Sequence, residues 1–179
     1  MNDGKISVRY ARALYDFACE NKCETEVYYA LRRFTSITAQ DLLAFEAVLK
    51  NPIISDNDKI TIITTALGNP NNDCLGTFVR FIVEKKRESK LHLIALKYQE
   101  QYRADKNILL THITTASELS PETLEKIKSH IADRFHAEVE TVVNVDPGII
   151  GGYTIDIEHN RLDVSIAGQL EKLKAELNG

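Results

Sequence analysis

The chain has 179 residues, of which 44% are hydrophobic and 27% are charged, and its formal net charge is −4. This length and composition are typical of a soluble globular protein with one or two compact domains. The acidic balance argues against a nucleic-acid-binding protein, because such proteins usually carry a basic excess.

The first helix is expected from Lys5 to Glu20, where apolar residues recur every three or four positions. The same periodicity predicts five further helices, at about 24–38, 39–50, 55–67, 75–83 and 89–104. Pro52 ends the third helix, and the pattern Ser55-x-x-Asp58 is a start signal for the fourth. Because the expected connections are short, these helices are typical of an antiparallel bundle.

The pattern changes at residues 105–107, and the remaining part of the chain carries the acidic excess. Strands are expected at 108–116, 138–145 and 153–157, with a hairpin tip at 158–160 and a returning segment at 161–164. A helix capped by Ser120 precedes the second strand, and a last helix is expected at about 163–177. We therefore predict a mainly α chain, with a six-helix bundle over residues 1–105 and a small α+β domain of β-α-β-β-α order over 106–179.

The stretch VDPGIIGGY, residues 145–153, holds three of the eight glycines and raises the question of a phosphate-binding loop. No Lys follows the glycines, as a phosphate loop requires, and the residues after them are typical of a strand rather than a helix, so neither nucleotide-binding pattern fits. We expect a structural turn instead, with positive φ at Gly148 and buried isoleucines at 149 and 150. The residues assigned to this turn are Asp146, Pro147, Ile150, Gly151 and Gly152.

Other residue types that carry chemistry form no recognisable catalytic or metal-binding pattern, so we predict no cofactor and no metal. The five histidines lack the H-E-x-x-H spacing, and Cys19, Cys23 and Cys74 are interpreted as free thiols in a reducing compartment. The run EKKRESK, residues 84–90, mixes charge signs and is expected to be a solvated helix end, with a basic contact patch as the alternative.

The apolar face of the first helix combines small residues (Ala11, Ala13, Ala18) with aromatic ones (Tyr10, Phe17). Core packing explains such a face, but small residues also let another helix approach closely and aromatic residues anchor it. Composition leaves both interpretations open.

Several segments together resemble the delta subunit family of bacterial F-type ATP synthases, which includes the mitochondrial oligomycin sensitivity-conferring protein (OSCP). The resemblance covers nearly the whole chain. It rests on RYARALYDFACE, LKNPIISDNDK, FVRFIVEKKRESKL and THITTASELSPETLEKI, and most specifically on VETVVNVDPGIIGGYTIDI followed by RLDVSIAGQLEKLKAEL.

The resemblance implies a non-catalytic connector that holds the catalytic head of the synthase to its peripheral stalk. The first domain would bind the N-terminal helix of an alpha subunit, and the second would bind the b subunits around its hairpin and final helix. The implied groove residues are Tyr10, Ala13, Leu14, Phe17, Thr77, Phe78, Phe81 and Glu84.

Location follows from the same resemblance and from the absence of a signal core or a bilayer-length apolar run in the sequence. We expect a peripheral protein at the cytoplasmic face of the membrane that reaches the membrane only through the complex. The alternatives are a free-standing helical adaptor and, less favoured by the glycine spacing, a small nucleotide-dependent enzyme.

Overall fold

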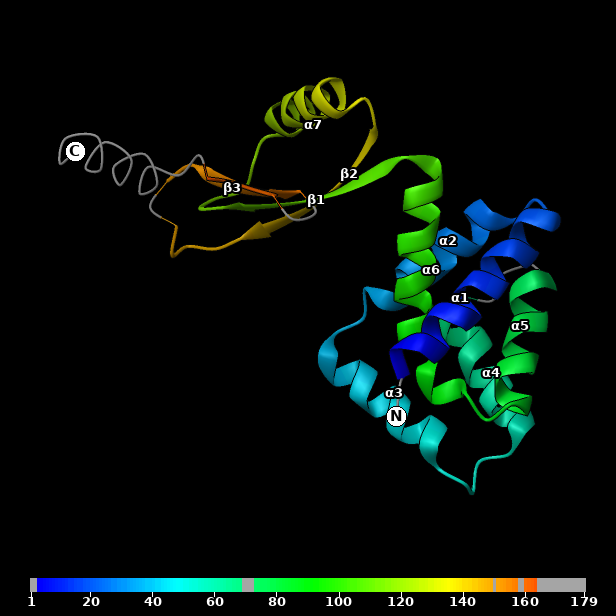
Figure 1. Ribbon diagram of the computed structural model, residues 1–179. Coiled ribbons are helices and arrows are strands. Elements are labelled where there is room, and N and C mark those ends of the chain that lie inside the picture. The colour runs from blue at the N-terminus through cyan, green and yellow to red at the C-terminus, as the bar shows by residue number, and fades with distance from the viewer. Residues whose placement is uncertain (1–2, 69–72, 150, 158–159, 164–179) are drawn as a thin grey trace. The chain divides into compact units, whose positions relative to one another are not determined.

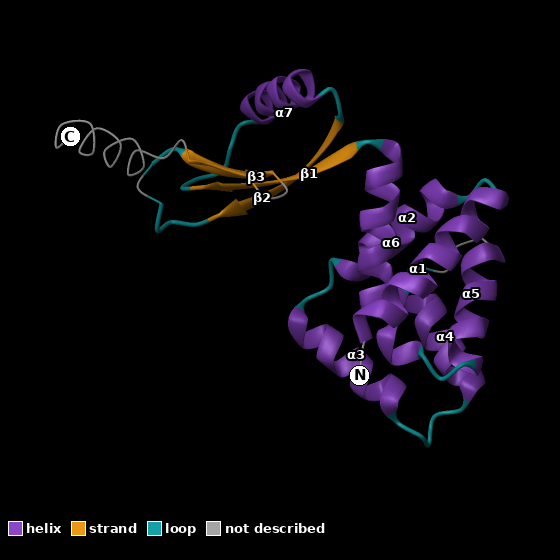
Figure 2. Cartoon of the chain, viewed as in Figure 1, coloured by secondary structure: helices purple, strands orange, loops and turns teal. Residues whose placement is uncertain are grey.

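The computed structural model describes residues 3–68, 73–149, 151–157 and 160–163. The chain divides into two compact units, residues 1–102 and 103–179. Figure 2 shows that the strands all belong to the second unit. The sequence-based boundary at residue 105 lies three residues further along, within the last helix that begins in the first unit.

The helices of the first unit are shown from blue to green in Figure 1. They are α1 (Asp3–Glu20), α2 (Glu24–Thr35), α3 (Ala39–Lys50), α4 (Asp56–Ala66), α5 (Asp73–Glu84), a 3-10 turn η1 (Glu88–Lys90) and α6 (Leu91–Lys106). Most bounds lie within two residues of those expected from periodicity. The expected loop at 68–73 and the hairpin tip at 158–160 lie largely outside the described residues.

Helix caps explain where several of these helices begin. The side chain of Ser55 accepts a hydrogen bond from the backbone N–H of Asp58 at 3.2 Å, as the Ser-x-x-Asp pattern predicts. The second helix was expected to reach Thr38, but it ends at Thr35. Thr38 instead caps α3, because its hydroxyl oxygen accepts the Asp41 backbone N–H and leaves Thr38 in an extended conformation.

Aromatic side chains fill the centre of the first unit. Tyr28 stacks on Tyr102 with ring centroids 4.2 Å apart, and Tyr15 meets Tyr98 edge-on at 5.6 Å. The buried hydroxyl of Tyr98 donates a hydrogen bond to the backbone oxygen of Glu24, and burial raises the pKa of this phenol. The contacts join α6 to α1 and α2, so residues far apart in sequence share one core.

One buried ion pair lies between α4 and η1. Lys59 Nζ is 2.7 Å from Glu88 Oε1, and each side chain is only 7% exposed. Glu88 Oε2 has no hydrogen-bond partner among the described residues. The expectation that residues 84–90 form a solvated helix end is therefore wrong for Glu88, since the η1 turn brings its carboxylate inward to meet the ammonium group.

Over its described residues, the second unit is a four-stranded sheet with one helix over it. Its elements are β1 (Ile108–Thr115), α7 (Pro121–Phe135), β2 (Glu138–Val145), β3 (Tyr153–Ile157) and β4 (Asn160–Asp163). The strand order is β2-β1-β3-β4, in which β1 pairs with β2 in parallel and with β3 antiparallel. The last helix expected at 163–177 lies outside the described residues.

Alternation along the strands sends one set of side chains toward α7. Ile113 of β1 and Ile155 and Ile157 of β3 form a buried cluster with Ile127 and Ile131 of α7. These two helical residues are four positions apart and so share a helix face. The core of this unit is therefore the layer between α7 and the sheet, which Figure 1 shows with the helix over one face.

Removing one partner of the buried ion pair should strongly destabilise the first unit. Glu88→Ala leaves the Lys59 ammonium buried without its carboxylate, and we expect the free energy of unfolding to fall by about 3–5 kcal/mol. Urea titration followed by circular dichroism of the helices measures this change.

The matched control is Glu100→Ala, which breaks the pair with Lys97, whose side chains are 40% and 55% exposed. That change should cost less than about 1 kcal/mol. The double variant Lys59→Met with Glu88→Leu should recover most of the loss, because no unpaired charge remains buried. Equal losses for Glu88→Ala and Glu100→Ala would contradict the role given to the buried pair.

Candidate functional site

A strip of exposed apolar side chains runs over α1 and α5. Phe17 is 37% exposed and Phe81 is 42% exposed, while Tyr10 is half-buried with its ring centroid 5.8 Å from that of Phe81. Ala13 is exposed between Tyr10 and Phe17 on the same face of α1, since the three residues follow a spacing of three and four. We call Tyr10, Ala13, Phe17 and Phe81 the aromatic strip.

The other residues assigned to the groove fall into two groups. Leu14 and Phe78 are 1% and 6% exposed and belong to the core, so they support the strip from below and cannot contact a partner directly. Leu14 is buried because it continues the Ser7–Ala11–Ala18 face, which points inward. Thr77 and Glu84 are exposed on α5, where Thr77 accepts a hydrogen bond from Arg80 and Glu84 pairs with Lys85.

Positive charge gathers at one end of the aromatic strip. Lys5, Arg9 and Arg87 line a cavity of about 360 Å³ together with Ile6 and Tyr10. The Arg9 guanidinium lies 5.9 Å from the Tyr10 ring centroid, and Lys85 Nζ lies 5.7 Å from that of Phe81. The hydrogen bond from Lys85 to Glu84 raises the pKa of this lysine. We call Lys5, Arg9 and Arg87 the basic end.

Local sequence indicated only part of the basic end, through the alternative of a basic contact patch at residues 84–90. Arg87 lies in the mixed-sign run that was expected to be solvated, and its two basic neighbours come from the first turns of α1, far away along the chain. Only the folding of α1 against α5 brings them together.

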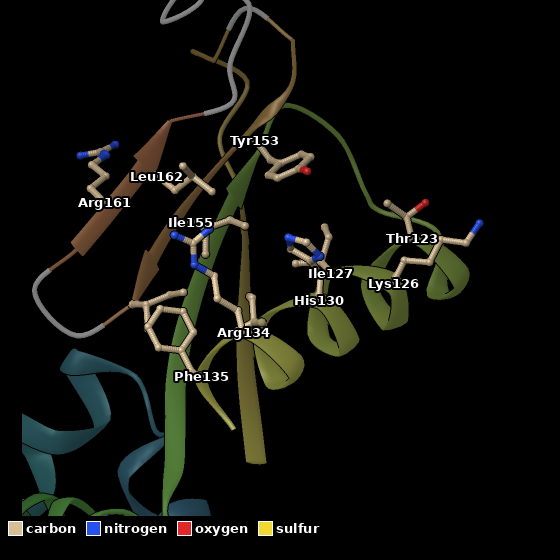
Figure 3. A pocket seen from close by; sticks show the side chains of 12 residues that line it. Thr123, Lys126, Ile127, His130, Arg134, Phe135, Tyr153, Ile155, Arg161 and Leu162 are labelled. Atoms are coloured by element: carbon tan, nitrogen blue, oxygen red, sulfur yellow. The ribbon is translucent and has the colours of Figure 1, made fainter. Parts of the chain in front are cut away.

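The second unit carries a larger hollow, between α7 and the strands β3 and β4. Its volume is about 870 Å³. Figure 3 shows that α7 contributes one wall while Tyr153 and Ile155 of β3 and Leu162 of β4 contribute the other. Phe135 and Leu162 are 41% and 54% exposed, so this cleft presents apolar surface to solvent. The charged residues that line this cleft are Lys126, Arg134 and Arg161, and His130 lines it as well.

The glycine stretch forms a turn that joins β2 to β3. Pro147 follows Asp146, whose backbone oxygen accepts the N–H of Ile149 at 3.1 Å and whose carboxylate accepts the N–H of Gly148 at 2.8 Å. Gly151 and Gly152 have φ of 67° and 80°, a region that favours glycine. Tyr153 then begins a strand, so the glycines do not lead into a helix as a nucleotide-binding loop would require.

The expectations for Gly148 and Ile149 of this turn are not met in the described residues. Gly148 does not adopt positive φ, because the hydrogen bond to the Asp146 side chain closes the turn without it. Ile149 is half-buried rather than buried, and Ile150 lies outside the described residues.

No constellation for catalysis or metal binding emerges over the described ranges. Within them, no three His, Cys, Asp or Glu side chains come together so as to hold a metal ion. His92 packs against Phe34, and burial lowers the pKa of its imidazole. A helix long and apolar enough to cross a bilayer is likewise absent from the described part of the chain. The features that stand out among the described residues are thus two surfaces, the aromatic strip with its basic end and the cleft beside α7.

Comparison with known proteins gives the same family over nearly the whole chain. The pattern of the ATP synthase delta (OSCP) subunit family matches residues 6–177. Proteins named ATP synthase subunit delta from Bacteroides fragilis and Bacteroides thetaiotaomicron are each 37% identical to the chain, covering 98% of it and 95% of their own length. A chloroplastic subunit delta from Porphyra purpurea is 31% identical, covering 97% of the chain and 94% of its own length.

A solved structure shares the fold. One chain of the mitochondrial ATP synthase hexamer of Toxoplasma gondii aligns with a TM-score of 0.71 at 19% identity, covering 97% of both chains. From the family match, its relatives and this fold, we conclude that the chain belongs to the ATP synthase delta (OSCP) family, the non-catalytic stator subunits of ATP synthases.

Proposed function

We propose that the chain links the catalytic head of an F-type ATP synthase to its peripheral stalk at the cytoplasmic face of the membrane. In this proposal, α1–α6 form the antiparallel six-helix bundle expected for residues 1–105, and it binds the N-terminal helix of an alpha subunit. Residues 106–179 bind the b subunits. The observation that carries the proposal is the aromatic strip, which is exposed in a chain of this family.

The aromatic strip suits a helix as its ligand. Phe17 and Phe81 expose apolar surface to solvent, and a partner helix would bury that surface. Full burial of such a side chain stabilises the complex by about 1.5–3 kcal/mol. Ala13 lies between Tyr10 and Phe17, where a small side chain lets a second backbone approach closely. Leu14 and Phe78 hold the two helices in place beneath the strip.

The basic end favours one orientation of the bound helix over the opposite one. Lys5, Arg9 and Arg87 repel one another unless an anion lies among them, so a bound helix is favoured when an acidic side chain of that helix reaches this end. A ligand placed in the opposite direction loses that pairing. Charge at the basic end therefore fixes the orientation and speeds association.

For the stalk we favour the cleft beside α7. The hairpin strand β4 supplies Leu162 and Arg161 to this cleft, and the exposed Phe135 extends it at the end of α7. An amphipathic helical end of a b subunit could place apolar residues against these side chains and acidic residues near Lys126 and Arg134.

Binding without chemistry is sufficient for such a role. The rotating central stalk exerts torque on the catalytic head, and a stator must hold the head against that torque while ATP is made. This task requires oriented binding surfaces on a rigid body and no reactive group.

Phe17→Ala and Ala13→Asp should each weaken binding of a peptide with the sequence of the alpha-subunit N-terminus while leaving the fold intact. Truncation of a central aromatic anchor costs about 2 kcal/mol, or roughly a 30-fold rise in Kd. Titration calorimetry with the full chain measures Kd, and circular dichroism checks the fold.

Leu43→Ala and Ala44→Asp provide matched controls, because both residues are exposed on α3. Neither should change Kd. Unchanged affinity in both α1 variants would show that the alpha-subunit helix does not bind at the aromatic strip.

Reversing charge at the basic end should act mainly on the association rate. We expect the double change Arg9→Glu with Arg87→Glu to slow association with the same peptide about tenfold at low salt, with the difference shrinking as salt is added. Stopped-flow or surface-based kinetics over a salt series gives both values. The control is Arg12→Glu, which reverses one charge on α1 outside the cavity and should slow association less. If Arg12→Glu slows association as much per reversed charge, the ligand does not pair specifically with the basic end.

The cleft beside α7 can be tested with apolar-to-acidic changes on its exposed wall. Leu162→Asp and Phe135→Asp should raise the Kd for a C-terminal fragment of the b subunit about tenfold or more, because each places a charge against an apolar ligand. The control is Val142→Asp, since Val142 is exposed on the face of the sheet away from α7. A loss of binding in the control alone would move the stalk contact to that opposite face.

A further inference from the structure

Two of the three cysteine thiols meet in the interior of the first unit. The Cys23 thiol donates a hydrogen bond to Cys74 Sγ at 2.7 Å, although the two residues are 51 positions apart. Cys23 and Cys74 are 8% and 6% exposed, whereas Cys19 is exposed. In the structure, none of these three cysteines is joined by a disulfide.

The geometry of this pair is close to that of a covalent bond. A disulfide joins two sulfur atoms at about 2.05 Å, so Cys23 Sγ and Cys74 Sγ need to approach by only about 0.7 Å. Cys23 is the residue before α2, and its backbone N–H bonds to Ala18 near the end of α1. Cys74 is the second residue of α5. Both positions lie at helix ends, where small backbone adjustments are least restricted.

We propose that Cys23 and Cys74 form a reversible intramolecular disulfide when the chain meets a small peroxide. The proposal adds an oxidation site to the stator subunit and is independent of which partner the aromatic strip binds. Because Cys23 and Cys74 are buried, a small oxidant reaches them more easily than a bulky one. Because their thiols are in contact, they are expected to link to each other rather than to Cys19.

The reaction balances with the peroxide as the two-electron oxidant. One of the two sulfurs attacks one peroxide oxygen, the O–O bond breaks, and that cysteine becomes a sulfenic acid while water leaves when hydrogen peroxide is the reagent. The other sulfur then attacks the sulfenic sulfur, the S–O bond breaks, and a second water leaves as the disulfide forms. Burial raises the pKa of the Cys74 thiol to about 12.

The bond would join the start of α5 to the short link between α1 and α2. Cys23 follows the C-terminal end of α1, and Cys74 lies in the first turn of α5. Tyr10 in the first half of α1 already meets Phe81 in the second half of α5, so the disulfide would add a covalent connection at the other end of this antiparallel pair. Closing so long a loop restricts the unfolded chain and stabilises the fold.

The test is treatment of the full chain with a small excess of hydrogen peroxide. Intact-mass spectrometry should show loss of two hydrogen atoms, and digestion without reductant should yield a linked peptide containing Cys23 and Cys74. We expect the melting temperature to rise by at least about 5 °C and to return to its starting value after dithiothreitol.

Cys19→Ser is the matched control and should form the same link with the same thermal shift. Cys23→Ser and Cys74→Ser should form no intramolecular link and show no shift, even though each remains folded by circular dichroism. A link that contains Cys19, only intermolecular products, or oxidation of wild type with no Cys23–Cys74 peptide would each overturn the proposal.

Discussion

The packing of α1 through its small side chains is the contact on which the rest of the first unit depends. Ser7, Ala11 and Ala18 are almost completely buried, so the other helices approach this face of α1 closely. Since an α-helix turns through 3.6 residues, burying that face points Tyr10, Ala13 and Phe17 outward. The same orientation brings Tyr10 to Phe81 and the first turns of α1 to Arg87. The burial of this one face of α1 therefore produces both the aromatic strip and the basic end.

A connector under torque must transmit force without changing shape, and the polar interactions of the first unit are arranged accordingly. The Lys59–Glu88 pair and the Tyr98–Glu24 hydrogen bond lie inside the unit, where low solvent access makes their loss costly. The pairs on the surface, such as Lys86 with Asp56, are exposed and contribute little to stability. Rigidity therefore comes from the interior, which leaves the surface free to specialise in binding.

The sequence pattern was enough to predict the bounds of two strands. β2 and β3 were expected at 138–145 and 153–157 and occur at those positions, because alternation and flanking turn residues mark both ends. Thr38 was expected to end α2, because the sequence does not distinguish the last residue of one helix from the N-cap of the next. The hydrogen bond from the Asp41 backbone shows that it caps α3. Gly148 was given positive φ because glycine permits it, yet the Asp146 side chain closes the turn by another route.

The other features that sequence reasoning missed join residues far apart in the chain. Glu88 was read as solvated because its partner Lys59 lies in another helix. The basic end and the contact between Cys23 and Cys74 arise in the same way, from α5 lying beside the start and the end of α1. For the candidate site, the family resemblance implied the residues of the aromatic strip, but only burial separates Phe17 and Phe81, which are exposed, from Leu14 and Phe78, which are not.

The most direct test of the proposed link to the catalytic head is photo-crosslinking within the assembled enzyme. A photoreactive phenylalanine analogue in place of Phe17 would be activated in membranes that carry the complete synthase, and the crosslinked peptide would be identified by mass spectrometry. We predict a crosslink to the N-terminal segment of an alpha subunit, with none from the same analogue in place of Leu43, which is exposed on α3. Crosslinks from position 17 to a b subunit, or to no part of an alpha subunit, would contradict the account.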